Sequence, residues 1–180
     1  MIFHFKYMNF IKNLIKKYKY ELTIAAVISF IIVKLITHYV FYLSLIPSES
    51  MTNTLAVGDK VYVSKNIFPL QKGEIYTFYH DNKLLIKRLI ATGGDKIEIN
   101  GDNVYVNNIK LNEPYVSSFM NKDKQINLSL IVPDGKCFFL GDNRNYSYDS
   151  RFWSNPFIDE SEIDGRATKI VSPKEHKTNL

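Results

Sequence analysis

Residues 96–107 read KIEINGDNVYVN, and this stretch decides the fold class of the chain. Residues 96–100 and 103–107 both alternate between apolar and polar side chains, as strands with one buried face do. Asn100, Gly101 and Asp102 between them form a turn sequence, because Gly and Asx residues readily adopt the positive φ angles of tight hairpins. The stretch therefore predicts a β-hairpin.

Similar short segments surround this hairpin on both sides. Gly and Asx residues separate these β-rich runs, and neither a useful helical periodicity nor an internal repeat follows residue 50. The predicted strands cover residues 60–65, 74–80, 84–91, 137–140 and 167–171. The sequence thus predicts a mainly β body, long enough to enclose one hydrophobic core.

The N-terminal part of the chain has a different character. Residues 22–47 read LTIAAVISFIIVKLITHYVFYLSLIP, in which only Lys34 and His38 are strongly polar. A helix of about 20 such residues crosses the hydrocarbon core of a bilayer. Five lysines precede the run, and basic flanks face the cytoplasm. We therefore expect a cytoplasmic basic N-terminus over residues 1–21, a transmembrane helix over 22–46 and an extracytoplasmic β-rich domain over 47–180.

Three other interpretations of the apolar run are weaker. The run is too long for a cleaved signal peptide and is followed by no small-x-small site. A buried core helix fits poorly with the preceding lysines and with apolar residues around the whole helix circumference. A surface amphipathic helix is the third alternative.

The distribution of charge argues against a nucleic-acid partner. The net charge is +5, but residues 48–180 contain 17 basic and 17 acidic residues, so the body is neutral. A nucleic-acid-binding domain needs a basic patch, which this pattern does not supply. The single cysteine, Cys137, excludes an intrachain disulfide and a cysteine-rich zinc cluster.

A candidate nucleophile follows the apolar run directly. Ser50 lies in the segment IPSESMTNTL, residues 46–55, and a serine needs a base to attack a carbonyl. Among the histidines after this run, His80 stands beside Asp81 and His176 lies near the C-terminus. A Ser-His-Asp triad is formally possible, but no G-x-S-x-G sequence surrounds Ser50.

Lysine is the other base available, and Ser-Lys pairs are a known variant of the catalytic triad. Lys87 interrupts the apolar run LLIKRLI at residues 84–90. On a regular strand Lys87 shares a face with Leu85 and Leu89, while Arg88 points the opposite way. An apolar face lowers a lysine pKa by penalising the charged form. The alternative is an edge-strand lysine that prevents aggregation.

Residues 141–151, GDNRNYSYDSR, form a second polar candidate. A calcium-binding EF-hand loop starting at Asp142 or Asn143 would need Gly at its sixth position and Glu at its twelfth, and neither is present. Two interpretations remain. The segment is an ordinary polar loop, or a rigid, internally hydrogen-bonded loop that orients other groups.

These segments, in this order, resemble the bacterial type I signal peptidases, membrane-bound serine enzymes that cut leader peptides from exported preproteins. The resemblance spans the whole chain and is carried by the N-terminal apolar run, residues 47–55, GDKVYVSK at 58–65, Lys87-Arg88 with Gly94-Asp95, and residues 141–151. It implies a mainly β signal-peptidase or self-cleaving-repressor-like fold with one N-terminal transmembrane α-helix.

The resemblance also implies roles for individual residues. Ser50 corresponds to the nucleophile and Lys87 to its general base. Ser48 corresponds to the serine that forms the oxyanion hole with the Ser50 N–H, and Ser147 to the serine that holds the lysine ammonium. Supporting roles fall to an ion pair and to two structural residues: Asp149 with Arg151, and Asp142 with Arg144. No metal and no organic cofactor is implied.

The same resemblance implies the substrate and the location. Preprotein signal peptides would be cut after small residues, at Ala-x-Ala sites, on the outer face of the bacterial cytoplasmic membrane. The expected partners are the signal peptides, the lipid bilayer and the export translocon, and no nucleic acid. Alternatives are a processing peptidase with a single client, an SOS-type self-cleaving protein and a non-enzymatic membrane-anchored adaptor.

Three sites in the sequence depart from the family pattern. Asn53 stands where the family has Pro, and Asn145-Tyr146 stands where it has Asp-Asn. Residues 91–94 stand where the family usually has a run that contains Leu and Pro. None of these positions is a proposed catalytic group.

Overall fold

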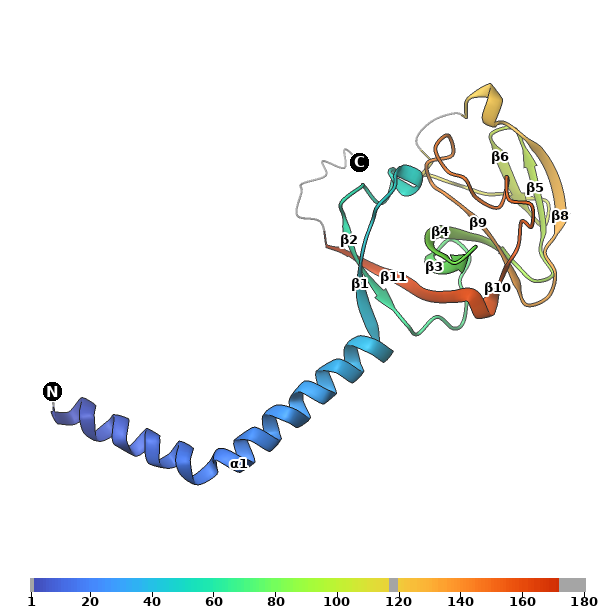
Figure 1. Ribbon diagram of the computed structural model, residues 1–180. Coiled ribbons are helices and arrows are strands. Elements are labelled where there is room, and N and C mark those ends of the chain that lie inside the picture. The colour runs from blue at the N-terminus through green and yellow to red at the C-terminus, as the bar shows by residue number, and fades with distance from the viewer. Residues whose placement is uncertain (1, 117–119, 172–180) are drawn as a thin grey trace. The chain divides into compact units, whose positions relative to one another are not determined.

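The computed structural model describes residues 2–116 and 120–171 (Figure 1). The contacts within the chain divide it at residue 40 into a helical unit and a β-rich unit. The mainly β class predicted from the sequence, with one N-terminal helix, is confirmed.

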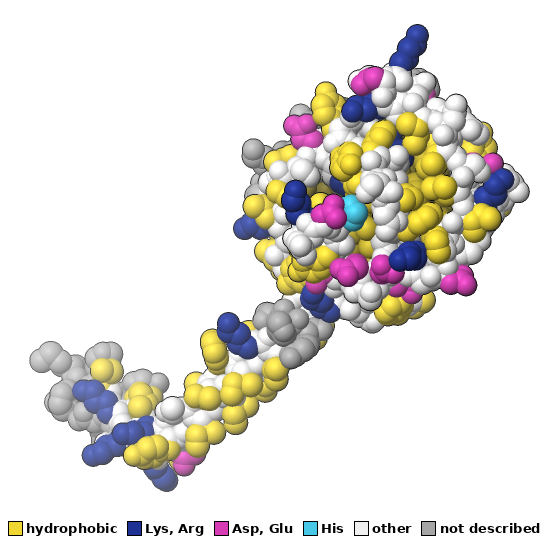
Figure 2. Space-filling view, turned by 45° about the vertical axis from the view of Figure 1, so that its right-hand side comes forward, with side chains coloured by type: hydrophobic (Ala, Val, Ile, Leu, Met, Phe, Trp, Pro, Cys, Tyr) yellow, Lys and Arg dark blue, Asp and Glu magenta, His cyan; other side chains and the backbone are white. Residues whose placement is uncertain are grey.

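The helical unit is the single helix α1, Ile2–Tyr39. Large apolar side chains such as Ile24, Phe30 and Leu35 are exposed along it, as the yellow atoms in Figure 2 show. No helix in the described part of the chain has the length and apolar character needed to cross a membrane. The helix ends before residue 46, because residues 41–45 pair with a strand of the β-rich unit.

The β-rich unit contains two antiparallel sheets (Figure 1). The larger sheet has seven strands, in the order β1 (Phe41–Leu45), β2 (Lys60–Ser64), β11 (Ile163–Val171), β3 (Ile75–His80), β4 (Lys83–Thr92), β9 (Lys136–Leu140) and β10 (Ile158–Asp159). The smaller has four, in the order β7 (Ile109–Lys110), β6 (Asn103–Val106), β5 (Lys96–Asn100) and β8 (Asn127–Ile131). Three short 3-10 helices complete the described elements: η1 (Glu49–Met51), η2 (Lys122–Lys124) and η3 (Glu160–Glu162).

The hairpin predicted at residues 96–107 is strands β5 and β6, with Ile97 opposite Val106 and Ile99 opposite Val104. All four of these side chains are buried, so the alternation in the sequence correctly identified the core face. Gly101 has a φ of +58° in the turn, a conformation that glycine adopts without steric penalty.

Strand β4 contributes to each of the three hydrophobic clusters of the β-rich unit. Ile86 packs with Met51 and its neighbours, Leu89 packs with a cluster of aromatic side chains, and Ile90 packs against the smaller sheet. A strand buried on both faces is a rigid support for a reactive group, because its neighbours fix the side-chain rotamers. Lys87 lies in the middle of this strand.

Candidate active site

The structure brings Ser50 and Lys87 into direct contact. Ser50 lies in η1, where the neighbouring Met51 is fully buried and fixes the 3-10 turn to the core. Lys87 Nζ donates a hydrogen bond to Ser50 Oγ at 2.5 Å. Both residues are buried, with exposed fractions of 6% for Ser50 and 4% for Lys87. A nucleophile and a base within hydrogen-bond distance are the minimal arrangement for covalent catalysis.

The sheet explains why the Lys87 amine is desolvated. β4 lies between β3 and β9, so the alternative of an edge-strand lysine is wrong. Leu85 and Leu89 pack in one cluster, as the strand alternation predicted, and Tyr76 of that cluster pairs with Lys87 across β3 and β4. Burial lowers the pKa of Lys87 to about 8, against the opposing effect of nearby carboxylates.

Ser48 lies beside the nucleophile. Its Oγ is 3.5 Å from Ser50 Oγ, and its backbone is extended, with φ −137° and ψ 162°. The Ser48 hydroxyl is therefore a potential donor on the same side of the loop as the Ser50 hydroxyl.

The segment after β9 packs directly against the nucleophile. The Asn143 backbone N–H donates to the Ser50 carbonyl at 3.0 Å, and the Asn143 side chain donates to the Glu49 carbonyl at 3.1 Å. In return, the Asn53 side chain donates to the Asp142 carbonyl at 3.1 Å. Asn53 is one of the positions that depart from the family pattern, and here its amide joins the two segments.

Gly141 permits this close approach. A Cβ at position 141 would lie 2.6 Å from the Ser50 carbonyl oxygen and 2.2 Å from Ser147 Oγ. Real Cβ atoms essentially never make such contacts, so a side chain at this position would displace the nucleophile segment or Ser147.

Ser147 reaches the site but makes no bond there. It is 5% exposed, and in the described part of the chain its hydroxyl has no hydrogen-bond partner. The resemblance implies that this serine holds the Lys87 ammonium, whereas Lys87 Nζ donates to Ser50 in this structure. A buried hydroxyl without a partner is unusual in native structures, and a catalytic role is one explanation for such a group.

Asp149 and Arg151 form a fully buried ion pair. Arg151 Nε and Nη2 donate to the Asp149 carboxylate at 2.8 and 2.9 Å. The same carboxylate accepts the Gly141 N–H at 3.0 Å. This pair therefore holds the start of the segment that packs on Ser50.

Asp142 and Arg144 pair with residues outside their own segment. Asp142 accepts hydrogen bonds from Arg88 at 2.8 and 2.5 Å and from Thr54 at 2.5 Å. Arg144 binds Glu113. No role for these three partners, Arg88, Thr54 and Glu113, was predicted from the sequence. A charged side chain in the middle of a buried strand requires an opposite charge. The position of Arg88 in an apolar run therefore indicated that an acidic partner packs against it.

His80 takes no part in the contacts of Ser50. Its ring stacks on Trp153 with a centroid distance of 4.1 Å, and its Nε2 lies 3.6 Å from Asp81. The hydroxyl of Ser50 contacts Lys87 and Ser48 instead. His176 lies outside the described residues. Within those residues, no group of His, Cys, Asp and Glu is arranged to hold a metal ion.

Comparison with known proteins finds signal peptidases. The family model for signal peptidase, peptidase S26, matches residues 19–172. Signal peptidase I of Bacillus amyloliquefaciens is 33% identical over 137 residues, covering 71% of this chain and 74% of that protein. Signal peptidase IB of Staphylococcus aureus (strain Mu50) is 33% identical over 172 residues, covering 85% and 89%. A crystal structure of a signal peptidase I from Enterococcus faecalis V583 has a TM-score of 0.49 at 29% identity, covering 54% of this chain and 96% of that chain.

Proposed function

This chain belongs to the signal peptidase family, peptidase S26, and we propose that it cleaves its substrates with Ser50 as the nucleophile and Lys87 as the general base. Signal peptidases I are serine peptidases that remove signal peptides from preproteins, and this is the reaction of the chain. Family membership excludes the non-enzymatic adaptor. The observation that carries the proposed roles is the buried 2.5 Å contact between Lys87 Nζ and Ser50 Oγ.

The proposed mechanism begins with proton transfer. A neutral Lys87 amine accepts the proton of Ser50 Oγ as this oxygen attacks the scissile carbonyl. The lowered pKa of Lys87, about 8, supports this role, because about half of the amine is neutral at that pH. The resulting Lys87 ammonium then protonates the leaving amine, and water hydrolyses the acyl-enzyme with Lys87 again as base.

We propose that the Ser48 hydroxyl and the Ser50 backbone N–H stabilise the oxyanion. Donors aimed at the developing negative charge contribute about 3–4 kcal/mol each in comparable enzymes. Ser147 is proposed to bind the Lys87 ammonium after proton transfer. Its hydroxyl is buried and without a partner in the described residues, which leaves it available for that bond.

We propose cleavage after small residues, at Ala-x-Ala sites. The support for this substrate preference is the membership of the chain in the signal peptidase family. A processing peptidase with a single client would use the same residues and differ only in substrate.

We further propose that α1 anchors the chain in the bacterial cytoplasmic membrane, with the β-rich unit on the outer face. The support is the exposed apolar surface of α1 after its lysines, since exposed apolar side chains favour lipid over water. The lipid bilayer and the export translocon are the proposed partners. We expect the full chain to resist carbonate extraction. We also expect protease to digest the β-rich unit only when it is added outside the membrane. Release into the soluble fraction would contradict the anchor.

The proposed catalytic roles are tested with purified protein. Full-length chain in detergent or proteoliposomes is mixed with a preprotein that carries an Ala-x-Ala site, and the product mass is measured. Wild type is expected to cut after the second Ala, whereas Ser50→Ala and Lys87→Ala are expected to be folded and inactive. Cleavage by a folded Lys87→Ala variant would overturn the proposed base. Absence of cleavage by folded wild type, with cleavage of another preprotein, would indicate the single-client enzyme.

A further inference from the structure

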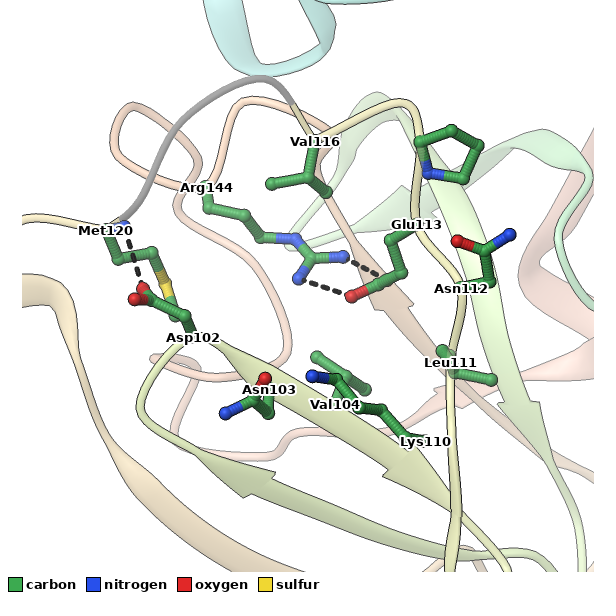
Figure 3. Close-up of a pocket in the computed structure, with 11 residues that line it drawn as sticks. Asp102, Asn103, Val104, Lys110, Leu111, Asn112, Glu113, Val116, Met120 and Arg144 are labelled. Carbon is green, nitrogen blue, oxygen red and sulfur yellow. Dashed lines mark hydrogen bonds and ion pairs between the residues drawn. The ribbon is translucent and has the colours of Figure 1, made fainter.

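The segment that follows β7 connects the smaller sheet to the catalytic loops. The segment covers residues 112–116, of which Asn112, Glu113, Pro114 and Val116 line a cavity of about 390 Å³. Figure 3 shows Glu113 and Arg144 facing each other in this cavity, with Val104 of β6 and Leu111, which follows β7, nearby.

Glu113 forms a buried, bidentate ion pair with Arg144. Arg144 Nη1 and Nη2 donate to the two carboxylate oxygens at 3.1 and 2.5 Å. The exposed fractions of the two side chains are 10% for Glu113 and 2% for Arg144. Bidentate pairs of this kind fix the orientation of the guanidinium as well as its position.

Tyr115 connects this pair to a second arginine. Its hydroxyl donates to Glu113 Oε1 at 2.9 Å, while the guanidinium carbon of Arg88 lies 3.8 Å from the centre of its ring. A cation over an aromatic face is attracted by the ring quadrupole, and more strongly when both are desolvated. Burial, followed by the Glu113 charge, raises the pKa of Tyr115, so its hydroxyl stays protonated at neutral pH.

Both arginines lead directly to the segment that packs on the nucleophile. Arg144 Nε donates to the Gly141 carbonyl at 3.1 Å, and Arg88 binds the Asp142 carboxylate. Gly141 and Asp142 directly precede Asn143, whose N–H donates to the Ser50 carbonyl. Arg88 is also the chain neighbour of Lys87. The contacts of Glu113 and Tyr115 therefore reach both members of the proposed Ser-Lys pair.

We propose that Glu113 and Tyr115 are positioning residues that hold Ser50 and Lys87 in their reactive geometry through Arg144 and Arg88. The inference rests on the proposed Ser50–Lys87 mechanism. A purely structural ion pair would affect stability alone, whereas a positioning role affects the chemical step. Displacement of reacting groups by about 1 Å lowers a rate by as much as about 100-fold.

Asp164 offers a matched control, because it forms a similar cluster elsewhere. Its carboxylate binds Lys65 and accepts the Tyr42 hydroxyl at 2.5 Å, as Glu113 binds an arginine and a tyrosine hydroxyl. The remaining described partner of Asp164 is Thr77, and none of the three belongs to the proposed catalytic machinery. Asp164→Asn and Glu113→Gln thus remove the same charge from similar surroundings.

The experiment compares kcat and KM of the full-length chain for one preprotein substrate, below the unfolding temperature of every variant. Glu113→Gln is expected to lower kcat about tenfold with KM changed less than about twofold, while Asp164→Asn keeps the wild-type kcat. Tyr115→Phe retains the ring over Arg88 and loses only the bond to Glu113, so a smaller fall in kcat is expected. Because both residues act through one set of contacts, the double variant should lose less than the product of the two effects.

Several outcomes would overturn the inference. One is a wild-type kcat in both Glu113→Gln and Tyr115→Phe, and another is an increase in KM alone. An equal fall of kcat in Asp164→Asn would show a general response to lost charge. If Glu113→Gln fails to fold, the kcat of Tyr115→Phe decides. A wild type that does not cleave, or a Ser50→Ala variant that does, would reject the proposed mechanism instead.

Discussion

Lys87 Nζ and Ser50 Oγ lie 2.5 Å apart, although 37 positions separate the two residues in the sequence. β4 holds the lysine among apolar neighbours, and η1 places the serine hydroxyl against its amine. The consequences of this contact are open to direct test.

Replacing Lys87 should remove activity whatever the replacement. Lys87→Ala and Lys87→Arg are both expected to lower kcat by roughly 10⁴-fold, because alanine has no base and a guanidinium stays protonated. Single-turnover cleavage of a preprotein measures the loss. His80→Ala is the control and should retain activity, since His80 stacks on Trp153 away from the contacts of Ser50. Inactivity of a folded His80→Ala variant would revive the Ser-His-Asp alternative.

The rate should rise with pH up to the pKa of Lys87. Since the amine must be neutral to act as base and its pKa is about 8, kcat/KM should fall about tenfold per pH unit below that value. Initial rates from pH 5 to pH 9 give the profile. A flat profile, with chemistry rate-limiting, would contradict the lysine base.

The same pKa predicts a pH dependence of stability. Between about pH 8 and pH 10 the unfolded chain protonates Lys87, with a pKa of 10.5, while the folded chain does not. The unfolded state then binds more protons, so the free energy of unfolding should rise with pH in this window. Denaturant titrations of wild type and Lys87→Met isolate the effect, because the variant lacks this slope. Parallel curves for the two proteins would show that Lys87 titrates normally.

A side chain at position 141 should displace the nucleophile. Gly141→Ala places a Cβ 2.6 Å from the Ser50 carbonyl and should lower both stability and kcat. Gly165→Ala is a matched control in β11, because its Cβ would lie 2.4 Å from Val63 Cγ1. This control should lose stability and keep its kcat at low temperature. Wild-type activity in Gly141→Ala would show that the segment relaxes without moving Ser50.

The ion pair of Asp142 and Arg88 should be important for stability. Asp142→Asn leaves the Arg88 charge without its buried partner, so a loss of about 3–5 kcal/mol is expected in the free energy of unfolding. Asp159→Asn is the control, because Asp159 pairs with Lys136 at the surface and is 53% exposed. Its loss should stay below about 1 kcal/mol. Equal losses in urea titrations would contradict the burial argument.

The sequence identified most of the fold because strand signals are local. Alternation along β5 and β6, with a turn sequence between them, gave the hairpin and its buried face. Strand β1 was missed because its residues continue an apolar run, and periodicity does not separate a short apolar strand from the end of a helix. Residues 41–45 form a strand and not a helix because they pair with β2, which lies further along the sequence.

The candidate site, like the fold, was predicted only in part. The order of the segments around Ser50, Lys87 and residues 141–151 pointed to the family and to the residues now proposed as catalytic. The partners of the arginines were not predictable, because Glu113 reaches Arg144 across 31 positions and Arg88 reaches Asp142 across 54. Charge pairs of this kind leave no periodic pattern in the chain.

The sequence by itself thus determined the β class, the family and the candidate nucleophile and base, since these depend on local patterns and on the order of short segments. Only the tertiary structure decided that β4 is an interior strand, that Lys87 is desolvated there, and that Glu113 and Tyr115 contact the arginines behind the site. The physical reason is that burial, pKa and ion pairing depend on neighbours brought together by folding.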